Sequence, residues 1–314
     1  MASYTVPFTR AAHKYDGDIS KKEETWLNHQ ARHFDRLFLN ELTLADWETE
    51  AKFIQKNLTD EVFEAAIKRL PPFAFDEKGE QLIAWTKERR NAILKTARNY
   101  YKILNKKVQI KGTNKNNLIE VERLSDVQTK VTVYEYSKKE KNKQLLYEKT
   151  FENNITKELQ IYGLDGNDDF RVTGRVRKSP IVRLVGGSGI DSFTDESKVT
   201  GLQKKTKIYD DEFEEVQLSL GKEAKNNLSH SAAENNFDFL GFNYNYSIPV
   251  PSFGANPDEG FFVGFGVTSN TFKFKRSQIH KWGGTYAFGN NAFAFNYEGD
   301  YLSLIHISEP TRPY

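Results

Sequence analysis

Large aromatic side chains alternate with small or polar ones near the C-terminus, and this two-residue period constrains the fold more than any other feature of the sequence. The apolar members are Leu240, Phe242, Tyr244, Tyr246 and Ile248 in the first group, Phe261, Val263, Phe265 and Val267 in the second, Trp282, Tyr286 and Phe288 in the third, and Phe293, Phe295 and Tyr297 in the fourth. Gly, Asn and Thr dominate the positions between them. A period of two places alternate side chains on opposite faces of a strand, so four strands with one aromatic face are predicted.

Two environments suit an aromatic face of this kind. In a soluble β-sandwich it packs on a second sheet. In an outer-membrane β-barrel it contacts lipid, and strands of about ten residues are long enough to cross a bilayer when tilted. We favour the barrel, and expect residues 236–301 to contact outer-membrane lipid after insertion by the barrel assembly machinery. Four strands are an incomplete transmembrane β-barrel, because the smallest single-chain barrels have about eight.

The N-terminal third has a helical period. Apolar residues recur at three and four positions from Trp26 to Leu42, Thr43 precedes a second helix as its N-cap, and a long helix is predicted from Lys78 to Asn105. The sequence therefore predicts a helical domain over residues 1–108.

The middle of the chain changes to a period of two. Strands are predicted at 118–123, 130–136, 145–151, 158–162, 170–176 and 181–185, with Asn, Gly, Asp and Lys clusters between them. Residues 109–200 are thus predicted to form an antiparallel or coiled β module with Gly/Asp turns. Residues 201–235 are polar, with little periodicity beyond Ile208 and residues 216–220, and we interpret them as a linker with one strand. The expected fold class is α+β.

Composition narrows the range of functions. The chain has no cysteine, which excludes a disulfide scaffold, and its formal net charge of +2 gives no reason to expect nucleic acid as a partner. A negative mean hydropathy excludes a bundle of membrane helices. No secretory signal is visible in the first residues, so either the protein stays in the cytoplasm or its N-terminus is missing.

Two Gly/Asp segments suggest a calcium site. Residues 186–193 fit the pattern G-G-x-G-x-D-x-U, and residues 163–170 fit part of it. Asp165, Asp168 and Asp191 could supply the oxygen ligands that Ca²⁺ prefers. However, the two segments are 23 residues apart, whereas stacked calcium coils advance by nine, so two tight turns of the β module are the preferred interpretation. His29 and His33 have a metal-ligand spacing, but we interpret them as a solvated or hydrogen-bonded pair.

Three longer stretches resemble known bacterial envelope proteins. Residues 248–266 are similar to a hairpin of surface-antigen barrels of the outer-membrane assembly-factor type. Residues 34–43 and 162–170 are similar to the region that precedes this barrel in proteins fused to a calcineurin-like metallophosphoesterase. The resemblance implies a phosphoesterase domain upstream, whose Asp-x-His, Gly-Asn-His-Asp and Gly-His motifs are not found here. Residues 302–313 are similar to a translated sequencing adaptor, so residues 302–314 are expected to be an artefact.

The sequence therefore favours a non-catalytic fragment of an outer-membrane β-barrel protein with a role in envelope transport or assembly. Residues 1–235 would be periplasmic. Two alternatives remain: the accessory part of a metal-dependent phosphoesterase, and a secreted calcium-binding β module. No cofactor is expected apart from the calcium considered above.

Overall fold

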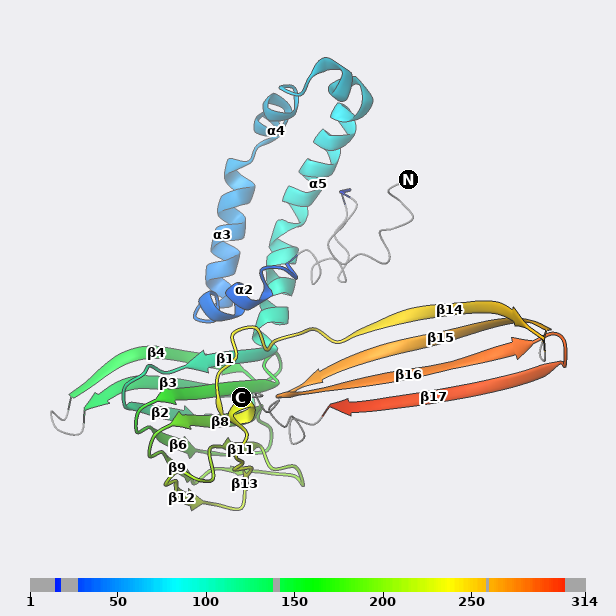
Figure 1. Ribbon diagram of the computed structural model, residues 1–314. Coiled ribbons are helices and arrows are strands. Elements are labelled where there is room, and N and C mark those ends of the chain that lie inside the picture. Colours follow the sequence, from blue (N-terminus) through cyan, green and yellow to red (C-terminus); the bar gives the residue numbers. More distant parts are fainter. Residues whose placement is uncertain (1–14, 18–27, 138–141, 258–259, 303–314) are drawn as a thin grey trace, which may run out of the picture. The chain divides into compact units, whose positions relative to one another are not determined.

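The computed structural model describes residues 15–17, 28–137, 142–257 and 260–302 (Figure 1). The chain divides into two compact units, residues 1–228 and residues 229–314. Helices precede several sheets, the last of which is antiparallel with four strands, so the α+β class is confirmed. The start of the first predicted helix and residues 303–314 of the adaptor-like segment lie outside the described residues.

The helical part of the first unit is built around a hairpin of two helices, α3 and α5, which lie side by side (Figure 1). Its elements are α2 (Arg32–Phe38), α3 (Leu44–Asn57), α4 (Asp60–Ile67) and α5 (Pro72–Asn105). The predicted N-cap is confirmed, because Thr43 and Asp46 form a capping box. α5 begins at Pro72 and not at Lys78, since a proline in the first turn loses no intrahelical hydrogen bond.

Two buried cations join the helices to the β module. The Arg36 guanidinium donates to the carbonyl oxygens of Leu104 and Lys107 at 3.1 and 2.7 Å. The Lys149 ammonium, on β4 (Asn142–Glu152), donates to the carbonyl oxygens of Asn40 and Leu42 at 2.6 and 2.8 Å. These bonds satisfy carbonyl groups that follow α2 and end α5, and so fix the base of the hairpin.

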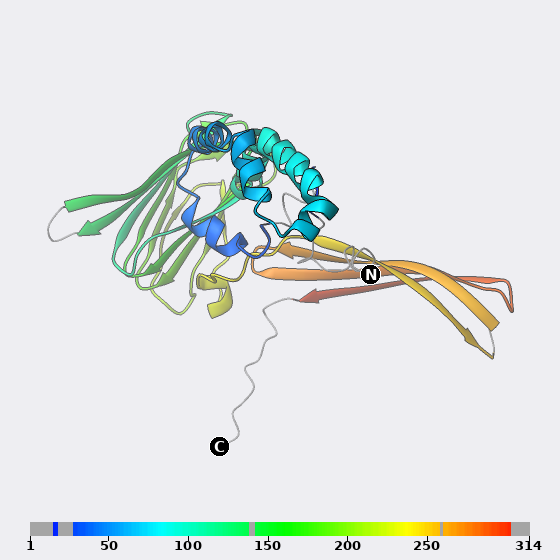
Figure 2. The same ribbon diagram turned by 90° about the horizontal axis from the view of Figure 1, so that it is seen from above.

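The β module is a parallel β-helix (Figures 1 and 2). The first sheet has the order β1 (Lys107–Lys111), β5 (Glu158–Asp165), β8 (Ile181–Ser188), β11 (Thr206–Tyr209) and β13 (Ala224–Asn226), all parallel. The second contains β12 (Gln217–Leu220), β9 (Ser192–Asp195), β6 (Asp169–Thr173) and β2 (Asn117–Glu122), also parallel, extended by the antiparallel hairpin β3 (Gln128–Ser137) and β4. A pair of two-residue strands, β7 (Arg175–Val176) and β10 (Lys198–Val199), lies beside them. The chain visits the two sheets alternately, so each coil stacks on the one before.

The core lies between the two sheets. Equivalent positions of successive coils hold similar residues, as with Ile161 and Leu184 in the first sheet and Phe170 and Phe193 in the second. The two phenylalanine rings stack with their centroids 4.7 Å apart, and neither is more than 1% exposed. The predicted strands from 118 to 185 are confirmed as β2 to β6 and β8.

The prediction of a linker over residues 201–235 is corrected by the structure. β11 and β13 belong to the first sheet and β12 to the second, so the β-helix continues to about residue 226. These strands have three or four residues, and too few side chains point inward to give a recognisable period. A short helix, α6 (Ala232–Asn235), lies in the second unit.

The second unit contains an antiparallel meander of four strands: β14 (Tyr246–Asn256), β15 (Gly260–Lys273), β16 (Arg276–Ala287) and β17 (Ala292–Leu302). The alternation predicted for the last three groups is confirmed. The strand predicted from the first group of residues is corrected by the structure. Residues 236–245 are not in a strand, and Ile248 pairs with Thr268 on the face opposite the aromatic residues. β14 instead runs on through Pro249 and Pro251, which an edge strand tolerates.

Candidate functional site

The two Gly/Asp segments lie directly above one another in the β-helix. Leu164 pairs with Gly187, and Asp169 pairs with Ser192, so the spacing of 23 residues is the length of one coil. Gly187 has a φ of 114°, and a Cβ there would lie 1.9 Å from the Leu164 carbonyl oxygen. Only glycine fits such a close approach of stacked turns. Calcium coils that advance by nine residues are therefore the wrong comparison for this β-helix, whose coil is 23 residues long.

Three carboxyl groups face the interior at these turns, and we call Asp168, Asp191 and Asp210 the carboxyl stack. Asp168 Oδ1 accepts from the Asn117 amide at 2.7 Å, and the Asp168 amide donates to Asp191 Oδ1 at 2.8 Å. Asp168 is 2% exposed, and the other two are fully buried. Within the described part of the chain, the Oδ2 atoms of all three have no hydrogen-bond partner.

A glycine makes room for this stack. A Cβ on Gly186 would lie 2.2 Å from Asp191 Oδ2 and 2.7 Å from Asp210 Oδ2. A larger residue at position 186 would therefore push both carboxyl groups aside. The stack therefore depends on glycines of the first sheet: Gly163 faces Asp168, and Gly186 faces Asp191 and Asp210.

Burial controls the protonation of the stack. It raises the pKa of Asp168 to about 8, assisted by the negative charges of Asp191 and Asp210. Burial also raises the pKa of Asp210 to about 7, with Asp191 as the main charged neighbour, and the pKa of Asp191 to about 6. At neutral pH the stack therefore holds protons that exposed aspartates would have lost.

The structure brings together two of the three predicted calcium ligands. Asp168 and Asp191 are stacked and buried, whereas Asp165 is exposed at the end of β5. Asp210, which the sequence reading missed, lies beside them because Tyr209 pairs with Val185. In the ranges that the structure describes, no three His, Asp or Glu side chains are arranged to hold a metal ion. Calcium binding stays a prediction.

The histidine pair near α2 has a local partner. The Arg32 guanidinium lies 3.3 Å from His29 Nδ1 and donates to the His29 carbonyl oxygen at 2.7 Å. His33 is buried.

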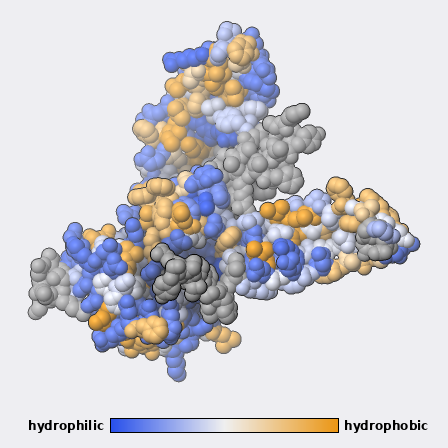
Figure 3. Space-filling view, viewed as in Figure 1, coloured by the Kyte–Doolittle hydropathy of each residue, from blue (hydrophilic) through white to orange (hydrophobic). Residues whose placement is uncertain are grey.

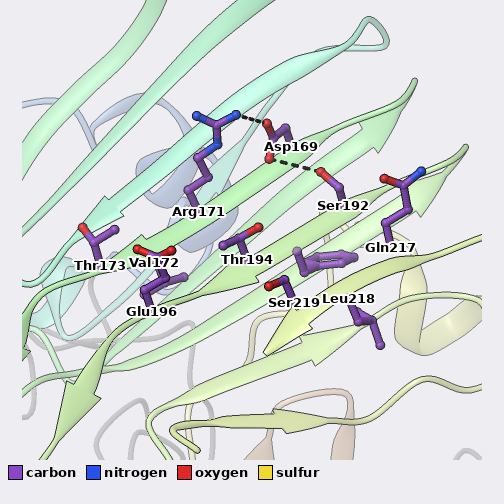
Figure 4. Close-up of a pocket in the computed structure, with 11 residues that line it drawn as sticks. Asp169, Arg171, Val172, Thr173, Ser192, Thr194, Glu196, Gln217, Leu218 and Ser219 are labelled. Carbon is purple, nitrogen blue, oxygen red and sulfur yellow. Dashed lines mark hydrogen bonds and ion pairs between the residues drawn. The ribbon is translucent and has the colours of Figure 1, made fainter. Parts of the chain in front are cut away.

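A shallow groove of about 610 Å³ runs over the outer face of β6, β9 and β12 (Figure 4). The Asp169 carboxylate pairs with Arg171 and accepts from the Ser192 hydroxyl at 3.1 Å. Thr194 and Gln217 add neutral polar groups. Asp169 neutralises Arg171, and Glu196 adds one carboxylate to the lining, so the groove offers dispersed hydrogen-bonding groups and a single unpaired negative charge among its lining residues.

The second unit exposes a continuous apolar surface, which we call the aromatic face. Its large members are Phe253, Phe261, Val263, Phe265, Val267, Trp282, Tyr286, Phe293, Phe295, Tyr297 and Tyr301. Phe265, Phe293 and Phe295 are 59%, 71% and 68% exposed, and Figure 3 shows hydrophobic side chains at the surface of this sheet. An apolar patch of this extent marks an interaction surface on a protein or a membrane.

The opposite face of the sheet combines small and polar residues at its centre with several apolar ones, among them Ile248, Val250 and Phe262. Gly264, Gly266 and Gly283 lie at its centre, and Lys281 forms an ion pair with Glu298 at 3.1 Å. The aromatic face thus carries most of the large exposed rings of the sheet, and the glycines and the ion pair lie on the other face. No helix of the described residues is long and apolar enough to span a bilayer.

In comparisons with known proteins, no family model, no curated protein and no solved structure matches the chain. The resemblance to surface-antigen barrels therefore stays a prediction. The function of the chain is inferred below from the geometry of its own residues.

Proposed function

We propose that the chain is a non-catalytic envelope protein whose β14–β17 sheet is embedded in the outer membrane, with the aromatic face against lipid. The β-helix and its helical hairpin form the periplasmic part, with a role in transport or assembly at the membrane. The single observation that carries this proposal is the aromatic face, because Phe265, Phe293 and Phe295 are more than half exposed to solvent there.

The length of the apolar band supports a membrane location. On β15 the band runs from Phe261 to Val267, which is roughly 20 Å along a strand that rises about 3.4 Å per residue. Barrels carry an outward apolar band about 25 Å tall. The β15 band alone is shorter than this, but Tyr301 on β17 pairs with Gln278 and continues the aromatic face past the level of Val267.

The ends of the band support the same interpretation. Trp282 and Tyr297 pair with each other where the band ends, and the next positions of β16 on this face are His280, Gln278 and Arg276. Trp and Tyr are enriched at membrane–water interfaces because one end of the ring is apolar and the other polar. The sequence of apolar, aromatic and charged residues along β16 matches the change from lipid interior to headgroups.

A single-tryptophan experiment tests the proposal. Replacing Trp26, Trp47 and Trp85 with Phe in the full chain leaves Trp282 as its only tryptophan. With phospholipid vesicles, we expect its emission to shift to shorter wavelength and to be quenched by brominated acyl chains. In the matched control, Trp282→Phe is combined with Thr285→Trp, which moves the probe to the opposite face of the same strand. That probe should be quenched much less, and equal quenching of the two would contradict the proposal.

A charge on either face gives a second test. Phe295→Lys places an ammonium on the aromatic face, whereas Asn296→Lys places one on the polar face of the same strand. Lysine on a lipid-facing strand costs about 2–4 kcal/mol near the bilayer centre. Co-flotation with vesicles should therefore fall at least about tenfold for Phe295→Lys and change little for Asn296→Lys. A larger loss for Asn296→Lys would contradict the assignment of the faces.

A further inference from the structure

Two cations lie opposite each other at the hairpin end that joins β15 to β16. Lys273, the last residue of β15, pairs with Arg276, the first residue of β16, and both are exposed. Directly opposed residues have Cβ atoms about 5 Å apart, and like charges in that position are destabilising. An anion that contacts both side chains would therefore stabilise this end of the sheet.

Part of the positive charge at this hairpin is already balanced within the second unit. The Arg276 guanidinium lies 3.4 Å from Glu234 Oε1. Lys275, in the turn, is attracted by the negative charges of Asp238 and Glu234. Within the described ranges, the Lys273 side chain forms no ion pair. Lys273 is therefore the cation for which the hairpin itself provides no counter-ion.

The cation pair lies on the same side of the sheet as the aromatic face, just beyond its end. Tyr301, the last large member of that face, pairs with Gln278, and Gln278 pairs with Thr271. Lys273 is two residues further along β15, which is roughly 7 Å along a strand. Headgroup layers add about 5–7 Å on each side of a hydrocarbon core about 30 Å thick. With Tyr301 at the hydrocarbon boundary, Lys273 and Arg276 lie among the headgroups.

The two ends of the sheet differ in charge, and this difference assigns the cations to one leaflet. The connections at the other end, residues 256–260 and 288–291, contain no lysine or arginine. β14 begins at Tyr246, which pairs with Asn270, so the chain enters the sheet at the basic end. The proposed function, on which this inference rests, places residues 1–235 in the periplasm. The basic end then lies in the periplasmic leaflet.

We propose that Lys273 and Arg276 bind the phosphate of an anionic phospholipid headgroup in the periplasmic leaflet of the outer membrane. Ammonium and guanidinium groups both form charge-assisted hydrogen bonds with phosphate oxygens. Gln278 lies between Arg276 and the aromatic face on β16 and adds an amide donor. Inorganic phosphate carries the same charge, but only a lipid holds its phosphate beside an apolar surface.

Co-flotation of the full chain with vesicles tests this preference. One set of vesicles contains phosphatidylcholine alone, and the other contains equal parts of phosphatidylcholine and phosphatidylglycerol. A basic residue near an anionic surface contributes about 1 kcal/mol, which is about fivefold in binding. We expect Lys273→Gln to bind the anionic vesicles about fivefold less than the unchanged chain does, and the zwitterionic vesicles equally well. An equal loss on both vesicles, or no loss on either, would overturn the inference.

A matched control separates a local site from net charge. Lys281→Gln removes the same charge from the opposite face of the sheet, where Lys281 pairs with Glu298. Its binding to anionic vesicles should fall by less than about twofold, because charges further apart than a Debye length are screened. Lys273→Arg keeps the charge and should retain full binding. Equal losses for Lys281→Gln and Lys273→Gln, or a fivefold loss for Lys273→Arg, would contradict a site at Lys273.

Two salts at equal ionic strength distinguish a lipid phosphate from a free one. Sodium chloride and sodium phosphate should weaken binding to the anionic vesicles equally, because both act by screening. A greater loss in sodium phosphate would assign Lys273 and Arg276 to free phosphate and overturn the lipid assignment.

The headgroup preference and the membrane location can fail separately. If brominated lipid quenches Trp282 in both kinds of vesicle but Lys273→Gln binds them as the unchanged chain does, only the headgroup inference is wrong. If Trp282 is quenched in neither, the membrane location and the inference that rests on it are both wrong.

Discussion

The β-helix and the C-terminal sheet use the same alternation of apolar and polar residues with opposite results. Phe170 and Phe193 of the β-helix are at most 1% exposed, while carboxyl groups of Asp168 and Asp191 are buried nearby. In the C-terminal sheet Phe293 is 71% exposed. The two regions differ in what covers the aromatic side chains. In the β-helix, the sheet that contains β5 and β8 covers Phe170 and Phe193, whereas no described layer covers the aromatic face. A strand's period thus predicts which residues share a face, and only the surroundings decide what that face contacts.

The largest expected effect comes from removing one ring in each region. Phe193→Ala should lower the free energy of unfolding of the β-helix by about 3–5 kcal/mol, because it leaves a cavity against Phe170. Phe295→Ala in aqueous detergent-free buffer should lower the free energy of unfolding of the C-terminal sheet by less than about 0.5 kcal/mol. Denaturant unfolding, followed by hydrogen exchange in peptides from residues 158–226 for Phe193→Ala and from residues 246–302 for Phe295→Ala, measures the two effects. A comparable loss for Phe295→Ala would mean that a soluble layer covers the aromatic face.

The next effect concerns pH and the buried acids. The folded chain raises the pKa of Asp168 to about 8 from an ordinary value of 3.8, so between these values it binds more protons than the unfolded chain. Stability therefore falls as pH rises across this range and levels off above about pH 8. The loss is about 1.4 kcal/mol for each pKa unit of difference between the two states. Melting temperatures from pH 5 to 8 should decrease accordingly.

Replacing Asp168 measures how much its titration contributes to the pH dependence of stability. Asp168→Asn keeps an oxygen that can accept from the Asn117 amide but cannot ionise. Its melting temperature should depend less on pH than that of the unchanged chain. Asp165→Asn, at the exposed neighbour, is the matched control and should retain the full slope. If the two variants have the same slope, the titration of Asp168 does not govern stability.

Local patterns predicted much of the fold. The capping box at Thr43 and the strands from 118 to 185 depend on neighbours in sequence, and they were correct. Two of the three residues of the carboxyl stack were predicted, and Asp210 was missed because it approaches Asp191 through the pairing of β11 with β8, with no motif around it in the sequence. β14 was misplaced because the alternation of residues 240–248 resembles a strand, whereas the strand begins at Tyr246 and continues through two prolines that an edge strand accepts. Contacts set by coil length or by edge position were therefore the ones that sequence reasoning missed.

The smallest expected effect concerns calcium, and it sharpens the contrast between a buried stack and a ligand site. Asp168 and Asp191 each use Oδ1 to accept a backbone amide, and Asp165 is exposed. Ca²⁺ takes six to eight oxygen ligands, which a stack built for hydrogen bonds and protons does not supply. Millimolar CaCl₂ at pH 7 should therefore change the melting temperature by less than about 1 °C, whereas a bound ion would raise it by linkage. MgCl₂ at equal ionic strength separates screening from binding. A rise specific to calcium and lost in Asp191→Asn would instead assign the stack to that ion, and the buried acids would then be ligands and not proton carriers.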